Sequence, residues 1–255
     1  MSGSTAIVTG GARGIGYAVV RRLAADGWNV AMCDLSQTIA EREAELDAIE
    51  GSVFVHPCDV SDEESVKYFV AQVIREFGSV DALVNNAGVG GALTYVTETT
   101  IEDFKKVLDV NVTGTFLMCK HVAPYIGLEK NGRIVNFGSI YGIQGVAGGA
   151  GYCASKGAIA ALTHSLALEL APKITVNTIA PGPIISDMYL EDQQFIADEN
   201  GRTIDEQLEL SRLKIPAGRQ GQGSDIAGAI AWLLSADADY VTGQTLSING
   251  GVLFN

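Results

Sequence analysis

The segment from Ser139 to Lys156 carries side chains that could move a proton. It holds a serine hydroxyl, then a glycine-rich stretch, then Tyr152 and Lys156, which are four residues apart. On a helix this spacing places the phenol and the ammonium on one face. A free phenol titrates near ~10, and a neighbouring positive charge lowers that pKa. We therefore expect Tyr152 to act as a general acid or base, with Ser139 binding the same substrate oxygen.

A glycine-rich turn near the N-terminus could bind a phosphate group. The apolar run Ala6 to Thr9 stops at Gly10-Gly-Ala-Arg-Gly-Ile-Gly16, and apolar residues at helical spacing follow. Glycines let the backbone approach a phosphate, and a helix N-terminus offers unpaired N–H groups and partial positive charge. The spacing G-x-x-x-G-x-G differs from the common dinucleotide fingerprint and from the P-loop. Its position after the first predicted strand favours a nucleotide over a simple connection between two elements.

An acidic residue ends the second predicted strand, Trp28 to Asp34. At roughly 20 residues beyond the glycine turn, a carboxylate can accept hydrogen bonds from the adenosine ribose hydroxyls and repels a 2′-phosphate. Arg13, inside the turn, could instead meet a 2′-phosphate. Because the charge of Asp34 would lie at the ribose itself, the sequence favours NAD over NADP.

Strands alternate with helices throughout the chain, which predicts a single doubly wound parallel sheet, Rossmann-like, with helices on both faces. The further strands are expected at Val53 to Val60, Ala82 to Gly88, Arg133 to Phe137, Ile174 to Ala180 and Gln244 to Asn249. The further helices are expected at Gln37 to Ile49, from a Ser61-x-x-Glu64 start, at Ile101 to Tyr125, at Tyr152 to Leu170 and at Asp225 to Leu234. We expect one dinucleotide-binding and catalytic domain over residues 1–255, with a lid at about 186–216.

The carboxyl ends of parallel strands meet at one edge of such a sheet, where ligands bind. The predicted strand ends are Gly10, Asp34, Asp59, Asn86, Ser139 and Pro181. Each signal alone has a structural explanation, and the Tyr152 and Lys156 pair alone fits a solvated helix face better. Their convergence on one edge favours an enzyme.

Asn111, inside a predicted helix where asparagine is unfavourable, either caps a kink or has a polar task.

Composition excludes several classes of function. The net charge of −13 disfavours nucleic acid and anionic membranes as partners. Four scattered cysteines show no metal-ligand spacing and are typical of free thiols in a reducing compartment. The N-terminus lacks a signal-peptide pattern, and no apolar stretch is long enough to span a bilayer. We expect a cytoplasmic protein without a metal site.

Together these motifs resemble the short-chain dehydrogenase/reductase family, in the right order and over nearly the whole chain. The residues that carry the resemblance are Thr9 to Gly16, Asn85-Asn-Ala-Gly88, Asn111, Ser139, Tyr152-x-x-x-Lys156 and Pro181-Gly182. The resemblance implies an NAD(P)-dependent alcohol dehydrogenase or ketone reductase that acts on a small-molecule alcohol or ketone. It also implies a homotetramer that pairs the helices near Ile101 and from Tyr152.

The resemblance further implies a role for each residue of the site. Tyr152 would carry the proton, Lys156 would lower its pKa and bind the nicotinamide ribose, and Ser139 would stabilise the substrate oxygen. Asn111 would hold a water that connects Lys156 to solvent. The implied cofactor residues are Gly10, Arg13, Gly14, Ile15 and Gly16 at the pyrophosphate, Asp34 at the ribose, Asp59 and Val60 at the adenine, Asn86, Ala87 and Gly88 along the cofactor, and Pro181, Gly182, Ile184 and Ser186 at the nicotinamide. The chain departs from the family's usual serine at Gly138 and from its frequent threonine at Ser186.

Two other functions fit parts of the sequence. A 3-oxoacyl-thioester reductase of lipid synthesis belongs to the same family, but Asp34 and the acidic charge count against NADPH and an acidic carrier. A non-catalytic dinucleotide-binding regulator would typically lose the tyrosine or lysine, and this chain keeps both. We expect the substrate to be set by residues 89–97, by Tyr141 and Gln144, and by residues 187–216, where Tyr189 and Phe195 suggest apolar contacts. The absence of a basic cluster in residues 187–209 disfavours a highly anionic substrate.

Overall fold

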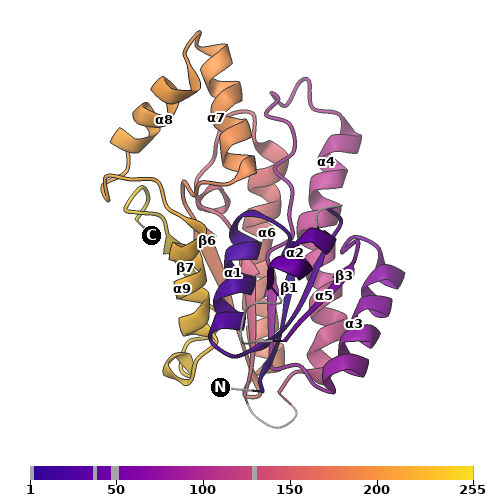
Figure 1. The fold of residues 1–255 in the computed structure, drawn as a ribbon. Helices are drawn as coiled ribbons and strands as arrows, with labels where there is room; N and C mark the ends of the chain where they lie inside the picture. The colour runs from indigo at the N-terminus through magenta and orange to yellow at the C-terminus, as the bar shows by residue number, and fades with distance from the viewer. Residues whose placement is uncertain (1–2, 37–38, 47–51, 128–130, 255) are drawn as a thin grey trace.

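A computed structural model of the protein describes residues 3–36, 39–46, 52–127 and 131–254 (Figure 1). In these residues seven parallel strands form one sheet in the order β3-β2-β1-β4-β5-β6-β7. The strands are β1 (Thr5–Thr9), β2 (Asn29–Asp34), β3 (Val53–Pro57), β4 (Ala82–Asn85), β5 (Gly132–Phe137), β6 (Ile174–Pro181) and β7 (Thr245–Ile248). The predicted doubly wound Rossmann-like sheet is confirmed. The strand order reverses between β1 and β4, and this is the place where such sheets bind ligands.

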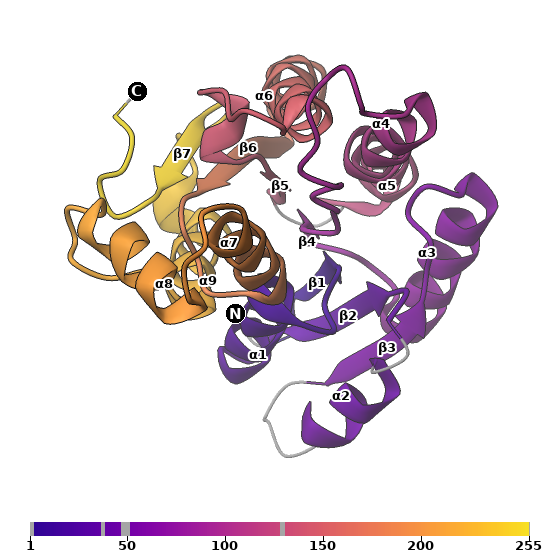
Figure 2. The same ribbon diagram turned by 90° about the horizontal axis from the view of Figure 1, so that it is seen from above.

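Helices cover both faces of the sheet (Figure 2). The helices are α1 (Gly14–Ala25), α2 (Ile39–Leu46), α3 (Glu63–Phe77), α4 (Ile101–Leu108), α5 (Gly114–Val122), α6 (Ala150–Leu170), α7 (Asp187–Glu199), α8 (Ile204–Leu213) and α9 (Gly223–Leu233). One apolar core joins α1, α2 and α9 to the sheet, and a second joins α3, α5 and α6 to its other face. Among the described helices, none has both the length and the apolar character to cross a membrane.

The central strand β1 shows how the sequence builds these two cores. Ala6 and Val8 belong to the core under α1 and α9, whereas Ile7 belongs to the core under α3 and α5. Successive side chains of a strand point to opposite faces of a sheet. A continuous apolar run is therefore required here, because β1 is buried on both sides.

The long helix predicted from Ile101 to Tyr125 is interrupted. After α4 the chain forms a π-helical segment, Asp109–Thr113, before α5 begins, and a short 3₁₀ turn, Ala123–Tyr125, follows. Asn111 lies in the middle of the π-helical segment and is buried. The sequence predicted either a cap at a kink or a polar task for this asparagine, and it lies where the regular helix is interrupted.

The predicted helix start at Ser61 is wrong. The N-cap of α3 is Asp62, whose carboxylate accepts from the backbone N–H groups of Glu64 and Ser65 at 3.2 and 3.3 Å. The hydroxyl and the N–H of Ser61 instead donate to Asp59 Oδ1, at 2.6 and 2.9 Å. A charged carboxylate suits the positive end of a helix dipole better than a hydroxyl, and the serine is occupied by the preceding turn.

Candidate active site

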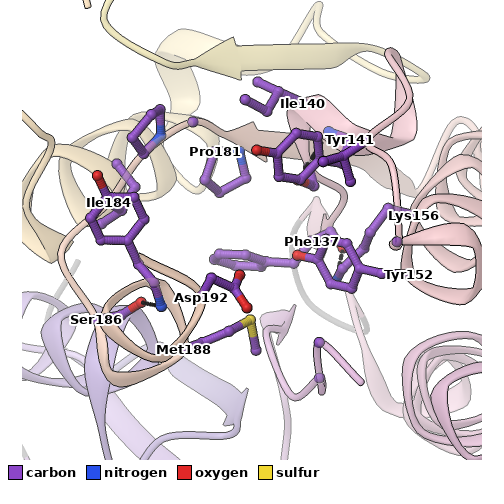
Figure 3. Close-up of a pocket in the computed structure, with 18 of the residues that line it drawn as sticks. Phe137, Ile140, Tyr141, Tyr152, Lys156, Pro181, Ile184, Ser186, Met188 and Asp192 are labelled. Carbon is purple, nitrogen blue, oxygen red and sulfur yellow. Dashed lines mark hydrogen bonds between the residues drawn. The ribbon is translucent and has the colours of Figure 1, made fainter. Parts of the chain in front are cut away.

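A pocket opens at the carboxyl edge of the sheet, between the ends of β5 and β6, α6 and α7 (Figure 3). The predicted site residues that line it are Ile15, Asn86, Gly88, Ser139, Tyr152, Lys156, Pro181, Gly182, Ile184 and Ser186. The other predicted residues lie outside this lining: Gly10, Arg13, Gly14 and Gly16 in the turn after β1, Asp34 at the end of β2, Asp59 and Val60 after β3, Ala87 after β4, and Asn111 behind Gly88. The structure therefore brings Ser139, Tyr152 and Lys156 into one cavity with the residues that were predicted to lie at the nicotinamide.

Tyr152 and Lys156 both project from α6 toward this pocket (Figure 3). The Lys156 Nζ atom lies 5.5 Å from the centroid of the Tyr152 ring. It also donates a hydrogen bond to the carbonyl oxygen of Phe137, the last residue of β5, at 2.8 Å. Lys156 is buried and has no acidic partner among the described residues. The predicted pairing of a phenol and an ammonium on one helix face is thus present and faces the cavity.

Ser139 is held at the edge of the pocket by the turn that follows β5. Its extended backbone caps the 3₁₀ turn Ile140–Gly142, and its hydroxyl oxygen accepts from the N–H of Tyr141 at 3.1 Å. This turn presses directly against α6, since a Cβ atom at Gly142 would lie 2.6 Å from the carbonyl carbon of Lys156. The close approach of a glycine backbone brings Ser139 to the level of Tyr152.

The direction of the Tyr152 pKa shift differs from the sequence-based expectation. Burial raises the pKa of Tyr152 to about 12, while a hydrogen bond with Ser139 lowers it and the charge of Asp192 raises it. Burial also lowers the pKa of Lys156 to about 8. The expectation that Lys156 lowers the tyrosine pKa is wrong for this structure, because desolvation of the phenol outweighs other influences. Both groups are shifted toward their neutral forms.

Asn111 ties the end of β4 to α6. Its Oδ1 atom accepts from the N–H of Val89 at 2.8 Å, and its Nδ2 atom donates to the carbonyl of Val89 and to the hydroxyl of Ser155, both at 3.0 Å. A Cβ atom at Gly88 would lie 3.1 Å from Asn111 Oδ1 and 3.5 Å from Lys156 Nζ. The asparagine therefore fixes the backbone that runs beside Lys156, and the π-helical segment supplies the turn that aims it there.

The glycine turn is fastened to the end of β4. Asn86 Nδ2 donates to the carbonyls of Thr9 and Gly10 at 3.0 and 2.9 Å, and the N–H of Ala87 donates to the hydroxyl of Thr9 at 3.0 Å. A Cβ atom at Gly16 would lie 2.1 Å from the carbonyl oxygen of Gly10, so a larger residue would deform the turn. The start of α1 is thereby held next to the pocket, where Ile15 lines it.

Asp34 organises the far side of the glycine turn. Its two carboxylate oxygens accept from the N–H groups of Ala12 and Ser36, at 3.0 and 2.8 Å. Arg13 turns away and pairs with Asp187 at the start of α7, at 3.3 Å. Sequence reasoning missed Arg42, which donates to the carbonyl of Ala12 at 3.0 Å and pairs with a glutamate on its own helix. A charged surface helix carries no sequence signal that singles out this arginine.

Further polar residues support the site without facing it. Asn85 Nδ2 donates to Asn136 Oδ1, and Asn136 Nδ2 donates to the hydroxyl of Thr163 on α6, each at 2.8 Å. Thr178 of β6 donates to the same threonine at 2.8 Å. The amide of Asn85, at the end of β4, therefore ties this strand to its neighbour β5. Asn136 and Thr163 were not predicted, because a single polar residue in an apolar strand or helix does not reveal its partner.

Within the predicted lid, α7 is the helix that lines the pocket. Met188, Tyr189, Asp192, Gln193 and Ile196 of α7 line the cavity. The expected position of Tyr189 at the pocket is confirmed, whereas Phe195 is not among the lining residues and is 46% exposed. Asp192 is the main residue that sequence reasoning missed, because nothing in the pattern of α7 separates it from its exposed acidic neighbours.

Comparison with known proteins gives a consistent picture over the full chain. A family model described as enoyl-(acyl carrier protein) reductase matches residues 10–253. The 3-oxoacyl-[acyl-carrier-protein] reductase of Staphylococcus aureus is 37% identical over 254 residues, and the match covers 97% of each protein. A solved structure of NAD⁺-bound xylitol dehydrogenase has a TM-score of 0.93 and 36% identity, covering 98% of this chain and 99% of that one. An actinorhodin polyketide ketoreductase variant with NADPH has a TM-score of 0.92 and 34% identity, covering 98% and 97%.

The buried ammonium predicts a pH-dependent stability. The pKa of Lys156 is about 8 in the folded protein against an ordinary 10.5, so the unfolded chain binds more protons between these values and the wild-type stability rises with pH across this window. The variant Lys156→Met lacks this titration. The unfolding free energy of the wild type minus that of Lys156→Met should therefore increase as pH rises. Urea denaturation at several pH values in this window measures both free energies. A difference that stays constant would contradict the buried position of the charge, and Lys173→Met provides an exposed lysine control.

Proposed function

The chain belongs to the short-chain dehydrogenase/reductase family of oxidoreductases, and on this premise we propose an NAD-dependent enzyme that interconverts a secondary alcohol and a ketone. The observation that carries the proposal is the Tyr152 and Lys156 pair at the pocket, with the Ser139 hydroxyl beside it. A phenol that can be protonated or ionised, next to an oriented hydroxyl, suits a reaction that moves one proton to or from a substrate oxygen.

A bound nicotinamide would supply or accept the hydride at the substrate carbon. In ketone reduction Tyr152 donates its proton to the substrate oxygen, and in alcohol oxidation it accepts that proton. Ser139 donates a hydrogen bond to the same oxygen, and the N–H of Tyr141 orients the serine. Because the pKa of Tyr152 is raised to about 12, the phenol is protonated and ready to donate at neutral pH. Acceptance of a proton requires the phenolate, which an additional positive charge near the ring would favour.

The residues around the glycine turn fit a dinucleotide. The start of α1 offers backbone N–H groups for a pyrophosphate, with Gly10, Gly14 and Gly16 leaving the approach free of side chains. Each carboxylate oxygen of Asp34 accepts one hydrogen bond from the protein and keeps capacity for ribose hydroxyls. Arg13 is directed to Asp187, in an exposed ion pair that holds it only weakly from a 2′-phosphate. These features favour NAD, with Asp59 and Val60 at the adenine, Asn86, Ala87 and Gly88 along the cofactor, and Pro181, Gly182, Ile184 and Ser186 at the nicotinamide.

A 3-oxoacyl-thioester reductase is the second candidate, because the S. aureus relative carries that activity in its name. The pocket offers this substrate little charge complementarity: Asp192 is acidic, and Lys156 is the one lysine or arginine in the lining. Preferential turnover of an acetoacetyl thioester with NADPH would favour this candidate over the alcohol dehydrogenase. A non-catalytic regulator is disfavoured, since Asn111, Ser139, Tyr152 and Lys156 are all in place.

We further propose a homotetramer in which the α4–α5 region and α6 form the contacts. Support comes from apolar side chains that these helices leave exposed. Leu168 of α6 is 84% exposed, and Phe116 of α5 is 45% exposed.

Residues 186–216 are proposed as the lid, since α7 supplies one wall of the pocket.

Removal of the phenolic hydroxyl tests the proton-transfer role. Tyr152→Phe should lower kcat by about 10²–10⁴, the usual contribution of general acid–base catalysis, while the affinity for NADH changes by less than about twofold. The measurements are steady-state rates on the best alcohol from a panel of sugars, diols and cyclic alcohols, and NADH binding by fluorescence. Tyr240→Phe makes the same chemical change at an exposed tyrosine and should keep full activity. Wild-type turnover by Tyr152→Phe would disprove the assigned role.

Substitution of Asp34, the carboxylate at the end of β2, tests the cofactor preference. The wild type should show a higher kcat/KM with NAD than with NADP, and Asp34→Ser should narrow or reverse this ratio because the repulsion of a 2′-phosphate is lost. Glu41→Gln removes an exposed negative charge from the nearby helix α2 and should leave the ratio unchanged. Tighter binding of NADP than of NAD by the wild type would overturn the preference.

A further inference from the structure

Asp192 places an unpartnered carboxylate in the wall of the pocket. Figure 3 shows this side chain directed from α7 into the cavity, on the side where Phe137 and Tyr152 lie. It makes no hydrogen bond or ion pair with any described residue. Other acidic groups of α7 and α8 are either paired, as Asp187 is with Arg13 and Asp198 with Gln194, or exposed on the surface, as Glu191, Glu199 and Asp205 are. Asp192 differs from them because it lines the cavity.

The surroundings of Asp192 are mostly apolar. The side chains of Met188 and Ile196, on the same helix, line the cavity beside it, and Leu93 and Val146 line it from other segments. Burial raises the pKa of Asp192 to about 6, with the charge of Glu191 adding to the shift. At neutral pH the carboxylate remains largely ionised, so the protein keeps a partly desolvated charge in its pocket without internal compensation.

A partly buried acceptor that lines a pocket and has no protein partner can bind a donor on a ligand. We propose that Asp192 is a specificity-determining residue that binds a hydrogen-bond donor, a hydroxyl or an ammonium, on the substrate. The inference rests on the proposed function and names its substrate class: a secondary alcohol or ketone that carries a second donor group. A simple mono-alcohol would leave the carboxylate unpaired, and a site of this kind rejects such an analogue strongly.

The position of the carboxylate indicates where that donor lies. Asp192 and Tyr152 line the same cavity, and the carboxylate is directed toward the side where Tyr152 lies (Figure 3). We therefore expect the donor group of the substrate to lie near the reacting carbon, and substrates with the donor one or two carbons away sample that range. Vicinal and 1,3-diols and the corresponding amino alcohols fit this spacing, whereas a 3-oxoacyl chain offers no donor there.

Matched substrate pairs test the inference. The pairs are butan-2-ol with butane-2,3-diol, pentan-2-ol with pentane-2,4-diol, and cyclohexanol with cyclohexane-1,2-diol, with 3-aminobutan-2-ol as the ammonium probe. The wild type should prefer at least one diol or the amino alcohol by about tenfold or more in kcat/KM over its mono-alcohol. Asp192→Leu should remove that preference. Asp192→Asn should lower kcat/KM for the amino alcohol more than kcat/KM for the diol. Glu191→Gln, one residue away and exposed, should leave the preference unchanged.

The pH profile supplies a second readout. In the wild type, KM for the preferred substrate should rise as pH falls through about 6, because protonation removes the charge of Asp192, and this rise should be absent in Asp192→Asn. The ionisable groups around the carboxylate are Tyr141, Tyr152 and Tyr189 of the pocket, Lys156 and the adjacent Glu191, and they are unchanged in the variant. Retention of the diol preference in Asp192→Leu, or equal turnover of both members of every pair by the wild type, would overturn the inference. In that case sensitivity of the turnover to Tyr152→Phe would still support the proposed function.

Discussion

The packing of α6 against the end of β5 is the constraint on which the site depends. Lys156 reaches beneath the ring of Tyr152 and donates to the carbonyl of Phe137, so one side chain joins the helix to the strand. Gly142 allows the turn after β5 to touch the backbone of α6, and this turn carries Ser139. If the helix shifted along the strand by one residue, the phenol, the ammonium and the serine hydroxyl would no longer face one cavity.

This packing also removes two ionisable side chains, Tyr152 and Lys156, from water. Burial shifts the pKa of the phenol upward and that of the ammonium downward, so each group is held closer to its neutral form than it would be in water. In the proposed reaction, a phenol that stays protonated can donate directly in ketone reduction, whereas alcohol oxidation needs additional positive charge to ionise the phenol. The hydrogen bonds of Asn111, and the chain of hydrogen bonds that runs from Asn85 through Asn136 and Thr163 to Thr178, hold the backbone around these two groups in place.

Much of the fold and the centre of the site could be predicted from the sequence, because both depend on local patterns. The apolar run of β1, the glycines of the turn and the spacing of Tyr152 and Lys156 each report a nearby geometric requirement. The start of α3 at Asp62, the pKa of Tyr152 and the orientation of Asp192 could not be read in this way. They depend on which residues compete for a cap, how deeply a group is buried and which way a helix faces, and these are properties of the assembled structure.

The most direct test of this account is a titration of the Tyr152 phenol, followed by carbon NMR of labelled tyrosine and assigned by comparison with Tyr152→Phe. The account predicts a pKa well above 10, near the value of about 12 that burial produces, and a lower pKa when NAD⁺ is added, since positive charge favours the phenolate. A phenol that titrates at or below 10 in the protein alone, or one whose pKa does not respond to NAD⁺, would contradict the claim that burial holds the proton on Tyr152 until the site is charged for catalysis.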